Sequence, residues 1–426
     1  MFITIQSKNI TGKRLLFTLL LIAPAYIMKA QIKGLPIEQD SLTTAHKHKP
    51  NRKPNDSLYK QEDFTDVLFK VAHIKAKPDT AKLKPGKLYL AVFPAIGYTL
   101  ANGGTATVAA NASFYTARLD STNLSSVLTY PLYSLYHQII VPVISSVWTE
   151  QNNINFLGDW RYYRYPSYTY GLGGNSSRLN EDQLNYSYVK VDQEALKNLA
   201  NNLYGGIGYN LDYHFYIQQL GTPETDYNTY NNGATKTVSS GILAHLKYDS
   251  RTNINNPKDA LFASISYRYN STLLGSDDDW QDVQIEIRKY IKLASNPNSV
   301  LAFWTWDEYT FGGKVPYLDL PSTGWDTYAN TGRGYIQGRY RGTSLIYLES
   351  EYRFGLTHNG LLGGVLFANG EAVPNWPSNR ITTINPGYGI GLRIKLNRYS
   401  DTNLCIDYGW GTQGSQGVFF NLGEVF

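Results

Sequence analysis

The chain has 426 residues, of which 39 are Lys or Arg and 34 are Asp or Glu, and its formal net charge is +5. Charged residues make up only 17% of the sequence, whereas it holds 35 Tyr, 8 Trp and 37 Gly, a usage typical of transmembrane barrels with aromatic girdles. The low charge gives no indication of a nucleic-acid partner, and the one cysteine, Cys405, excludes an internal disulfide.

The first 30 residues predict a secretory signal peptide. Basic residues precede an apolar run over residues 15–25, and the small residue Ala30 stands at the expected cleavage point. The run is about eleven residues long, whereas a membrane-spanning helix needs roughly twenty. Because the segment holds four basic residues and no acidic one, its removal lowers the net charge from +5 to about +1.

Residues 31–87 predict a mostly unfolded periplasmic leader, because they are polar, basic and interrupted by prolines. Residues 62–74 differ, since Phe64, Val67 and Val71 recur at helical spacing with acidic residues at the start. A short amphipathic helix is therefore expected there. Docking of this helix against its own barrel, plugging of the lumen and binding of a partner protein remain alternatives.

After residue 87 the apolar period becomes two, which predicts β-strands that alternate between two environments. Tyr388 and Ile390 share one face of such a strand, whereas Arg393 and Lys395 share the other. A soluble β-sandwich would show the same alternation. A helical membrane protein is excluded, because the longest apolar stretch, residues 139–148, is far too short to span a bilayer.

Strand counting over residues 88–426 gives about sixteen crossings, an even number as in single-chain bacterial outer-membrane barrels. The connections alternate in length, and short turns are expected on the periplasmic side with long loops outside. The expected fold is an all-β, 16-stranded antiparallel transmembrane β-barrel. Its short connections are 151–153, 199–202, 357–360 and 397–401, and its long ones include 167–184, 219–235 and 312–343.

The last strand is expected to run from residue 416 to residue 426, with Val418, Phe420, Leu422 and Phe426 on one face. Phe426 would then be the terminal aromatic residue that serves as the C-terminal assembly signal of outer-membrane barrels. A soluble domain that ends on a buried strand is the alternative interpretation of this segment.

Four short segments, 313–317, 332–335, 338–341 and 349–354, carry a resemblance to the BamA/TamA outer-membrane barrel superfamily, to which two-partner secretion transporters belong. In that family an Arg-Gly-aromatic tripeptide lies at the tip of the sixth external loop, which folds back into the barrel lumen. The matching residues here are Gly332, Arg333, Gly334 and Tyr335. Strand counting independently makes 312–343 the sixth external loop.

A guanidinium inside a lumen needs a carboxylate partner. Strand parity places Glu349 and Glu351 on the inward face of the strand that follows the loop, and Glu351 is the natural partner of Arg333. Many family members add an Asp on the thirteenth strand, in an aromatic-x-Asp-x-Gly pattern. This sequence has Ala368 at that position, so the resemblance implies a clamp with carboxylates on one side only.

The resemblance implies a bacterial outer-membrane protein that helps proteins insert into, or polypeptides cross, that membrane. A passive pore and a structural barrel, dimeric or not, remain alternatives. A leader of about 57 residues is too short for the family's periplasmic POTRA repeat and a linker, so a separate periplasmic partner protein is expected to deliver substrate. Outer-membrane lipids, lipopolysaccharide and a second copy of the chain are the other expected contacts.

No cofactor, metal or enzymatic site is predicted. The seven histidines show no ligand spacing. Asp277, Asp278 and Asp279 fit a solvated acidic loop better than a Ca²⁺ site. Ser134 and His137 lie close in sequence but on opposite faces of a strand, so they do not suggest a nucleophile and its base.

Overall fold

The computed structural model describes residues 61–64, 66–67, 86–221, 226–293, 299–398 and 400–426. The expected signal peptide, residues 1–30, and nearly all of the expected leader, residues 31–87, lie outside the described residues. Within the expected helix over residues 62–74, Phe64, Asp66 and Val67 are helical, and the residues after Val67 lie outside the description. None of the described helices is long and apolar enough to cross a membrane.

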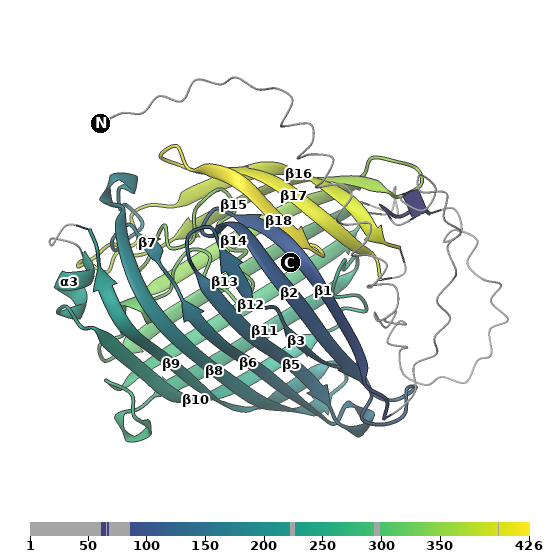
Figure 1. Ribbon diagram of the computed structural model, residues 1–426, viewed down its shortest axis with the longest axis horizontal. Coiled ribbons are helices and arrows are strands. Elements are labelled where there is room, and N and C mark those ends of the chain that lie inside the picture. The colour runs from purple at the N-terminus through teal and green to yellow at the C-terminus, as the bar shows by residue number, and fades with distance from the viewer. Residues whose placement is uncertain (1–60, 65, 68–85, 222–225, 294–298, 399) are drawn as a thin grey trace.

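The described residues form eighteen strands in one antiparallel sheet that curves into a barrel (Figure 1). The expectation of an all-β antiparallel fold is confirmed. The strands are β1 (Tyr89–Thr99), β2 (Gly103–Phe114), β3 (Ser125–Thr129), β4 (Leu132–Ser134), β5 (Ile139–Trp148), β6 (Ile154–Arg164), β7 (Ser167–Thr169), β8 (Asp182–Ala200), β9 (Leu203–Gln219), β10 (Lys236–Asp249), β11 (Ala260–Asn270), β12 (Trp280–Lys292), β13 (Val300–Gly312), β14 (Ser344–Gly355), β15 (Leu362–Ala372), β16 (Asn385–Asn397), β17 (Thr402–Trp410) and β18 (Gln416–Leu422).

The expected crossing 125–135 is divided into two strands, and a short additional strand, β7, lies in the expected long connection 167–184. β3 and β4 both pair with β2 and with β5, and β6 and β7 both pair with β8. Pro131 lies in the first gap and Pro166 in the second. Proline has no backbone N–H to donate to a neighbouring strand, so it interrupts the ladder at these points. This is why the structure has eighteen strands where sixteen were expected.

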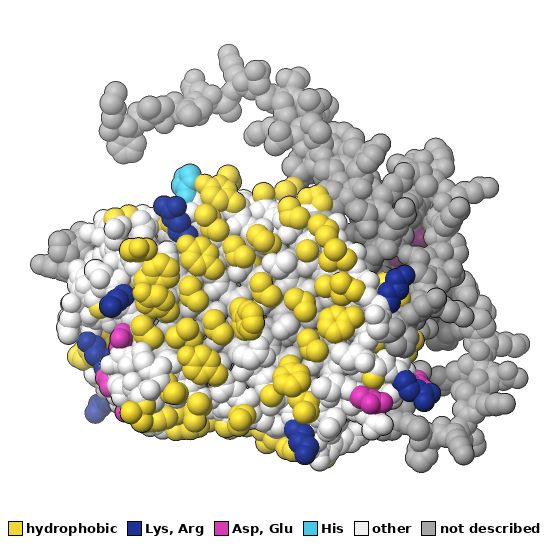
Figure 2. Space-filling model, turned by 60° about the horizontal axis from the view of Figure 1, so that its bottom comes forward, with side chains coloured by type: hydrophobic (Ala, Val, Ile, Leu, Met, Phe, Trp, Pro, Cys, Tyr) yellow, Lys and Arg dark blue, Asp and Glu magenta, His cyan; other side chains and the backbone are white. Residues whose placement is uncertain are grey.

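The outer face of the sheet is apolar, whereas the inner face carries buried charged side chains beside aromatic clusters. On the side of the barrel seen in Figure 2, hydrophobic side chains cover the middle of the outer face, and charged side chains lie toward the two ends. On β16, Tyr388 and Ile390 are exposed on the outer face, whereas Arg393 is buried inside. Alternate outward-facing and inward-facing residues with an apolar outer band are the pattern of a transmembrane barrel.

The two ends of the barrel differ. Long connections and α3 (Asp226–Asn231) lie at one end, here called the loop end (Figure 1). Short turns lie at the other end, here called the turn end, and the helical residues 64 and 66–67 lie there too (Figure 1). The backbone N–H of Glu62 donates to the carbonyl of Asn359 in the turn between β14 and β15 (3.0 Å).

β1 and β18 meet at a seam. The ring of Tyr98 in β1 lies 6.5 Å from the ring of Phe420 in β18, centroid to centroid. Among the described strands, however, no hydrogen-bonded ladder joins β1 to β18, and β1 pairs only with β2. The sheet is therefore not closed at the seam, and β1 and β18 each keep one unpaired edge.

The expected extent of the last strand is wrong. β18 ends at Leu422, and Gly423 adopts a left-handed conformation (φ +84°) that turns the chain inward. Phe426 is consequently buried inside the barrel, where its ring stacks on that of Trp304 (5.3 Å). Phe420 and Leu422 remain exposed on the outer face, so Phe426 does not share a face with them as the sequence suggested.

Candidate lumen site

The side chain of Arg333 lies inside the barrel, only 1% exposed, and contacts three carboxylates. Its Nη1 donates to Asp407 Oδ2 (2.7 Å) and its Nη2 to Glu351 Oε1 (2.5 Å). The same Nη2 also donates to Glu349. Glu349 and Glu351 come from β14 and Asp407 from β17, so the loop between β13 and β14 is tied to two parts of the wall.

Strand periodicity positions these groups. Glu349 and Glu351 are buried on β14, while Leu348 and Tyr352 between and beside them are exposed on the outer face. The guanidinium carbon of Arg333 also lies 3.7 Å from the centroid of a phenylalanine ring, Phe367 on β15. A cation above an aromatic face in a desolvated site adds to the attraction of the carboxylates.

The loop tip depends on two glycines beside Arg333. Gly332 and Gly334 have φ of +77° and +112°, a region that L side chains rarely adopt. A Cβ on Gly334 would also lie 2.8 Å from the carbonyl oxygen of Trp410. Next to them, the hydroxyl of Tyr335 donates to the carbonyl of Pro386 (2.6 Å), which fastens the tip to β16.

The clamp is part of a larger buried network of three arginines and four carboxylates. Arg353 Nε donates to Glu351 Oε2 (2.6 Å), and Arg393 Nη1 donates to Asp407 Oδ1 (2.5 Å). Arg393 Nε also donates to Glu424 Oε2 (2.7 Å). Buried charges at such sites need several partners to offset their desolvation, and here each arginine has at least two carboxylates. The members are Arg333, Arg353, Arg393, Glu349, Glu351, Asp407 and Glu424.

The expectation of a one-sided clamp is wrong. Ala368 faces outward, so an aspartate at that position could not reach Arg333. Its neighbour Asn369 faces the lumen instead, and Asn369 Nδ2 donates to the backbone oxygen of Arg333 (2.9 Å). The second carboxylate side is provided by Asp407, which sequence reasoning missed. The alternation along β17, where Cys405 and Asp407 are buried, could have revealed it.

Two further arginines of the loop are buried without a carboxylate within 4 Å among the described residues. Arg339 Nη2 donates to the backbone oxygen of Ser176 (2.7 Å) and lies near the ring of Tyr340. Arg341 Nη1 donates to the backbone oxygens of Tyr317 (3.0 Å) and Leu320 (3.2 Å). These contacts fasten the loop to itself and to the connection between β7 and β8.

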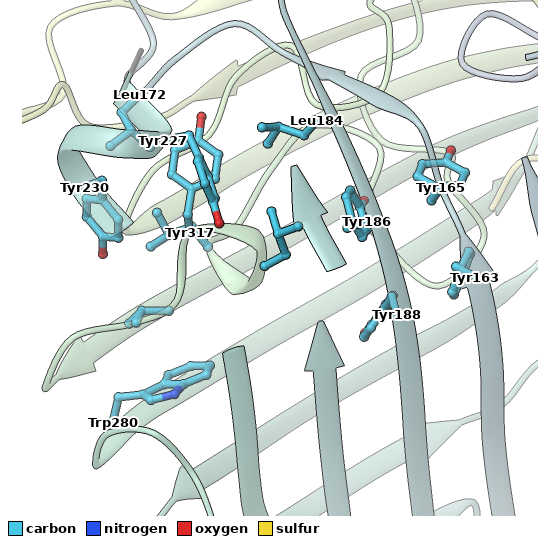
Figure 3. Close-up of a cluster of buried hydrophobic side chains, with 13 residues drawn as sticks. Tyr163, Tyr165, Leu172, Leu184, Tyr186, Tyr188, Tyr227, Tyr230, Trp280 and Tyr317 are labelled. Atoms are coloured by element: carbon cyan, nitrogen blue, oxygen red, sulfur yellow. The ribbon is translucent and has the colours of Figure 1, made fainter. Parts of the chain in front are cut away.

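An aromatic cluster holds the first part of the loop at the loop end (Figure 3). Figure 3 shows Tyr317 beside Tyr227 of α3, and their rings meet edge to face at 5.3 Å. The hydroxyls of Tyr317 and Thr169 lie 2.6 Å apart. Because loop residues from 315 to 341 pack against several elements of the wall, the loop occupies the lumen rather than standing outside it.

The other residue sets considered in the sequence have ordinary structural partners. Asp277 and Asp279 accept backbone N–H groups from Val238 (2.8 Å) and Thr272 (2.6 Å). Ser134 Oγ donates to the side chain of Gln138 (2.9 Å) and makes no contact with His137 Nδ1, which lies against Tyr133.

Comparisons with known proteins cover most of the chain. The family described as "Omp85 superfamily domain" matches residues 143–426. One similar solved structure, BamA from Haemophilus ducreyi lacking POTRA domains 1-3, has a TM-score of 0.54 at 15% identity, over 79% of this chain and 69% of that one. Another, CdiB from Acinetobacter baumannii, has a TM-score of 0.51 at 12% identity, over 79% of this chain and 59% of that one. No curated protein matches the chain.

Proposed function

Because the chain belongs to the Omp85 superfamily, we propose that this outer-membrane barrel helps polypeptides insert into or cross the outer membrane. The observation that carries the proposal is the combination of an occupied lumen with an unpaired seam. The clamp on Arg333 keeps the loop inside the barrel, and the edges of β1 and β18 lack a ladder between them.

Unpaired strand edges favour this function over a passive pore. An edge strand presents a row of free N–H and C=O groups that can pair with an incoming extended segment. In a bilayer such groups gain more from pairing, since the hydrocarbon core offers them no water. A client strand could therefore grow at the seam, between Tyr98 and Phe420, while the filled lumen stays closed to solutes.

We also propose that the barrel crosses the membrane sixteen times, although the described sheet has eighteen strands. β3 with β4, and β6 with β7, share partner strands on either side of a proline, and we count each pair as one interrupted crossing. The barrel then has sixteen crossings, and an even number leaves both chain ends on the side of the short turns. In this orientation the turn end faces the periplasm.

The partners follow from this arrangement. Outer-membrane lipids and lipopolysaccharide would contact the apolar outer face, and a separate periplasmic protein would bring client chains to the turn end. A second copy covering part of the outer face is the alternative if the barrel is structural rather than active. Cross-linking in native membranes distinguishes the two, because a structural dimer gives a single discrete adduct of twice the mass.

Depletion of the protein tests the proposed function. The outer-membrane proteome and the secretome are compared before and after depletion, with re-expression of the unaltered chain as the control. We expect selective loss of some outer-membrane or secreted proteins that re-expression restores. An unchanged proteome and secretome would rule out the proposal.

A further inference from the structure

A small cavity of about 70 Å³, open to solvent, lies at the turn end of the barrel. Its wall comes from β14, β15, β16 and the adjoining turns, and Gln61 of the N-terminal segment also lines it. Six charged residues line this cavity, and cations outnumber carboxylates two to one. They are Lys258, Arg353, Arg393, Lys395, Asp401 and Glu424.

The surplus positive charge belongs to the rim rather than to the floor. On the floor, Arg353 and Arg393 are matched by the buried carboxylates of the lumen network. On the rim, Lys258 Nζ lies 2.8 Å from Asp401 Oδ2, and Lys395 bonds to the other oxygen of the same carboxylate. One acid thus serves two lysines. The side chain of Lys258 is 37% exposed and can meet a ligand, whereas that of Lys395 is only 13% exposed.

An acidic segment of the chain itself lies across this rim. Arg398 follows β16 in the same turn as Asp401, and its Nη1 donates to Asp66 Oδ2 (2.5 Å). The backbone N–H of Arg398 donates to Asp63 Oδ2 (3.1 Å). In the neighbouring turn, Asn359 Nδ2 donates to Glu62 Oε2 (2.9 Å). Asp63 and Asp66 therefore bond to the turn that contributes Asp401 to the rim, and Glu62 bonds to the turn that contributes Gly360 to the cavity wall.

We propose that this rim is a docking site for an acidic segment of a client polypeptide, and that residues 61–67 occupy it in cis until such a segment replaces them. The proposal rests on the proposed function and specifies the charge of the segment that arrives. The side chains of Arg398 and Asp66, which form an ion pair, are 24% and 21% exposed. Partly exposed ion pairs of this kind contribute little to stability. The segment 61–67, here called the strap, is consequently exchangeable, and an arriving acid could form short-range ion pairs with Arg398 and the rim lysines in its place.

Peptide binding to the purified full-length protein tests this site. The probe is a fluorescent peptide with the sequence of residues 61–67, and the control peptide carries Gln or Asn in place of its three acids. The variant D63N/D66N weakens the strap, so we expect it to bind the acidic peptide about tenfold more tightly than the unaltered protein, because the site is then more often free. Adding K258Q/K395Q to that variant should remove most of the gain.

A matched variant controls for lost charge. K236Q/K314Q removes two exposed lysines at the loop end, and in the D63N/D66N background it should leave peptide binding unchanged. Thermal unfolding checks that each variant is folded, and K258Q alone replaces the double variant if that one fails to fold. Equal binding of the acidic and neutral peptides to D63N/D66N, or equal losses from K258Q/K395Q and K236Q/K314Q, would overturn the proposal.

This test is independent of the depletion experiment. If peptide docking fails while depletion still changes the proteome, the docking site is wrong and the proposed function stands. If docking holds while depletion changes nothing, the rim binds acidic segments but the proposed function is wrong.

Discussion

Arg333 should contribute more to stability than the other buried arginines of its loop, because it alone faces three carboxylates. We expect Arg333→Ala to lower the free energy of unfolding by about 3–5 kcal/mol, since it leaves buried carboxylates without a counter-charge. Arg341→Ala frees only neutral backbone oxygens and should cost about 1–3 kcal/mol. Denaturant unfolding in detergent measures the free energy of unfolding of both variants. Equal decreases would show that the contacts of Arg333 contribute no more to stability than those of Arg341.

The two glutamates of β14 should behave differently. Glu351 has contacts with Arg333, Arg353 and Arg393, whereas Glu349 pairs with Arg333 alone. Because the network holds four carboxylates and three arginines, neutralising Glu349 removes its one excess negative charge. We expect Glu349→Gln to change the free energy of unfolding by about 1 kcal/mol or less, and Glu351→Gln to lower it by about 3–5 kcal/mol. The reverse order in the same unfolding assay would mean that the network is assigned incorrectly.

A charge swap between Arg333 and Glu351 is not expected to restore stability. The sequence alone suggests a direct pair, for which Arg333→Glu with Glu351→Arg would recover part of the loss. The structure places Arg353 2.6 Å and Arg393 3.7 Å from the Glu351 carboxylate. An arginine at position 351 would therefore face two like charges, so the double variant should be no more stable than Arg333→Ala. Recovery of unfolding free energy would show that Glu351 has Arg333 as its dominant partner.

For single residues, the sequence indicated Arg333 and its partners Glu349 and Glu351 on β14, because the loop motif and the strand parity agree. The alternation along β17 could have placed Asp407 in the lumen, but its pairing with Arg333, 74 residues away in the sequence, depends on how the loop folds back into the barrel. The error at Ala368 came from matching a family pattern one residue out of phase with the strand. In a strand, one residue of shift moves a side chain to the opposite face.

The loop between β13 and β14 should determine conductance. Its residues pack on the aromatic cluster at the loop end and on the lumen network, so the intact protein is expected to show small, irregular openings in planar bilayers. Deletion of residues 313–342 should make the openings larger and longer, while deletion of residues 273–278 in another loop should not. A large, stable conductance that the first deletion does not alter would favour a passive pore.

Strand positions were predictable because the period of two persists through the whole barrel. β12 and β17 begin and end at the expected residues, 280–292 and 402–410. The errors fall where a local backbone property overrides the pattern. Pro131 and Pro166 interrupt strands, and Gly423 turns the chain inward. Apolar alternation alone could not place Phe426 inside, because a phenylalanine suits a lipid face equally well.

The molecule as a whole combines an occupied lumen with an unpaired seam, and these two features together favour the proposed function over its alternatives. A pore needs an open lumen, and a structural barrel needs no open seam. The lumen network and loop contacts were partly visible in the sequence. The missing ladder between β1 and β18 was not, because the alternation within a strand is the same whether or not its outer edge is paired.

The most direct test of this account is a reversible cross-link across the seam. Tyr98 and Phe420 are partly exposed on the outer face with ring centroids 6.5 Å apart, and the variant Y98C/F420C can be bridged by a short, cleavable bifunctional reagent. Cys405 is buried and should not compete. The control I207C/A244C bridges β9 and β10, which a ladder already joins at those residues.

Each variant is expressed in cells depleted of the unaltered protein, and the outer-membrane proteome and secretome are measured before and after the bridge is cleaved. We predict that the bridged seam blocks restoration of the lost proteins, that cleavage relieves the block, and that the bridged control restores them throughout. A bridged seam that restores the lost proteins as fully as the control would contradict the account.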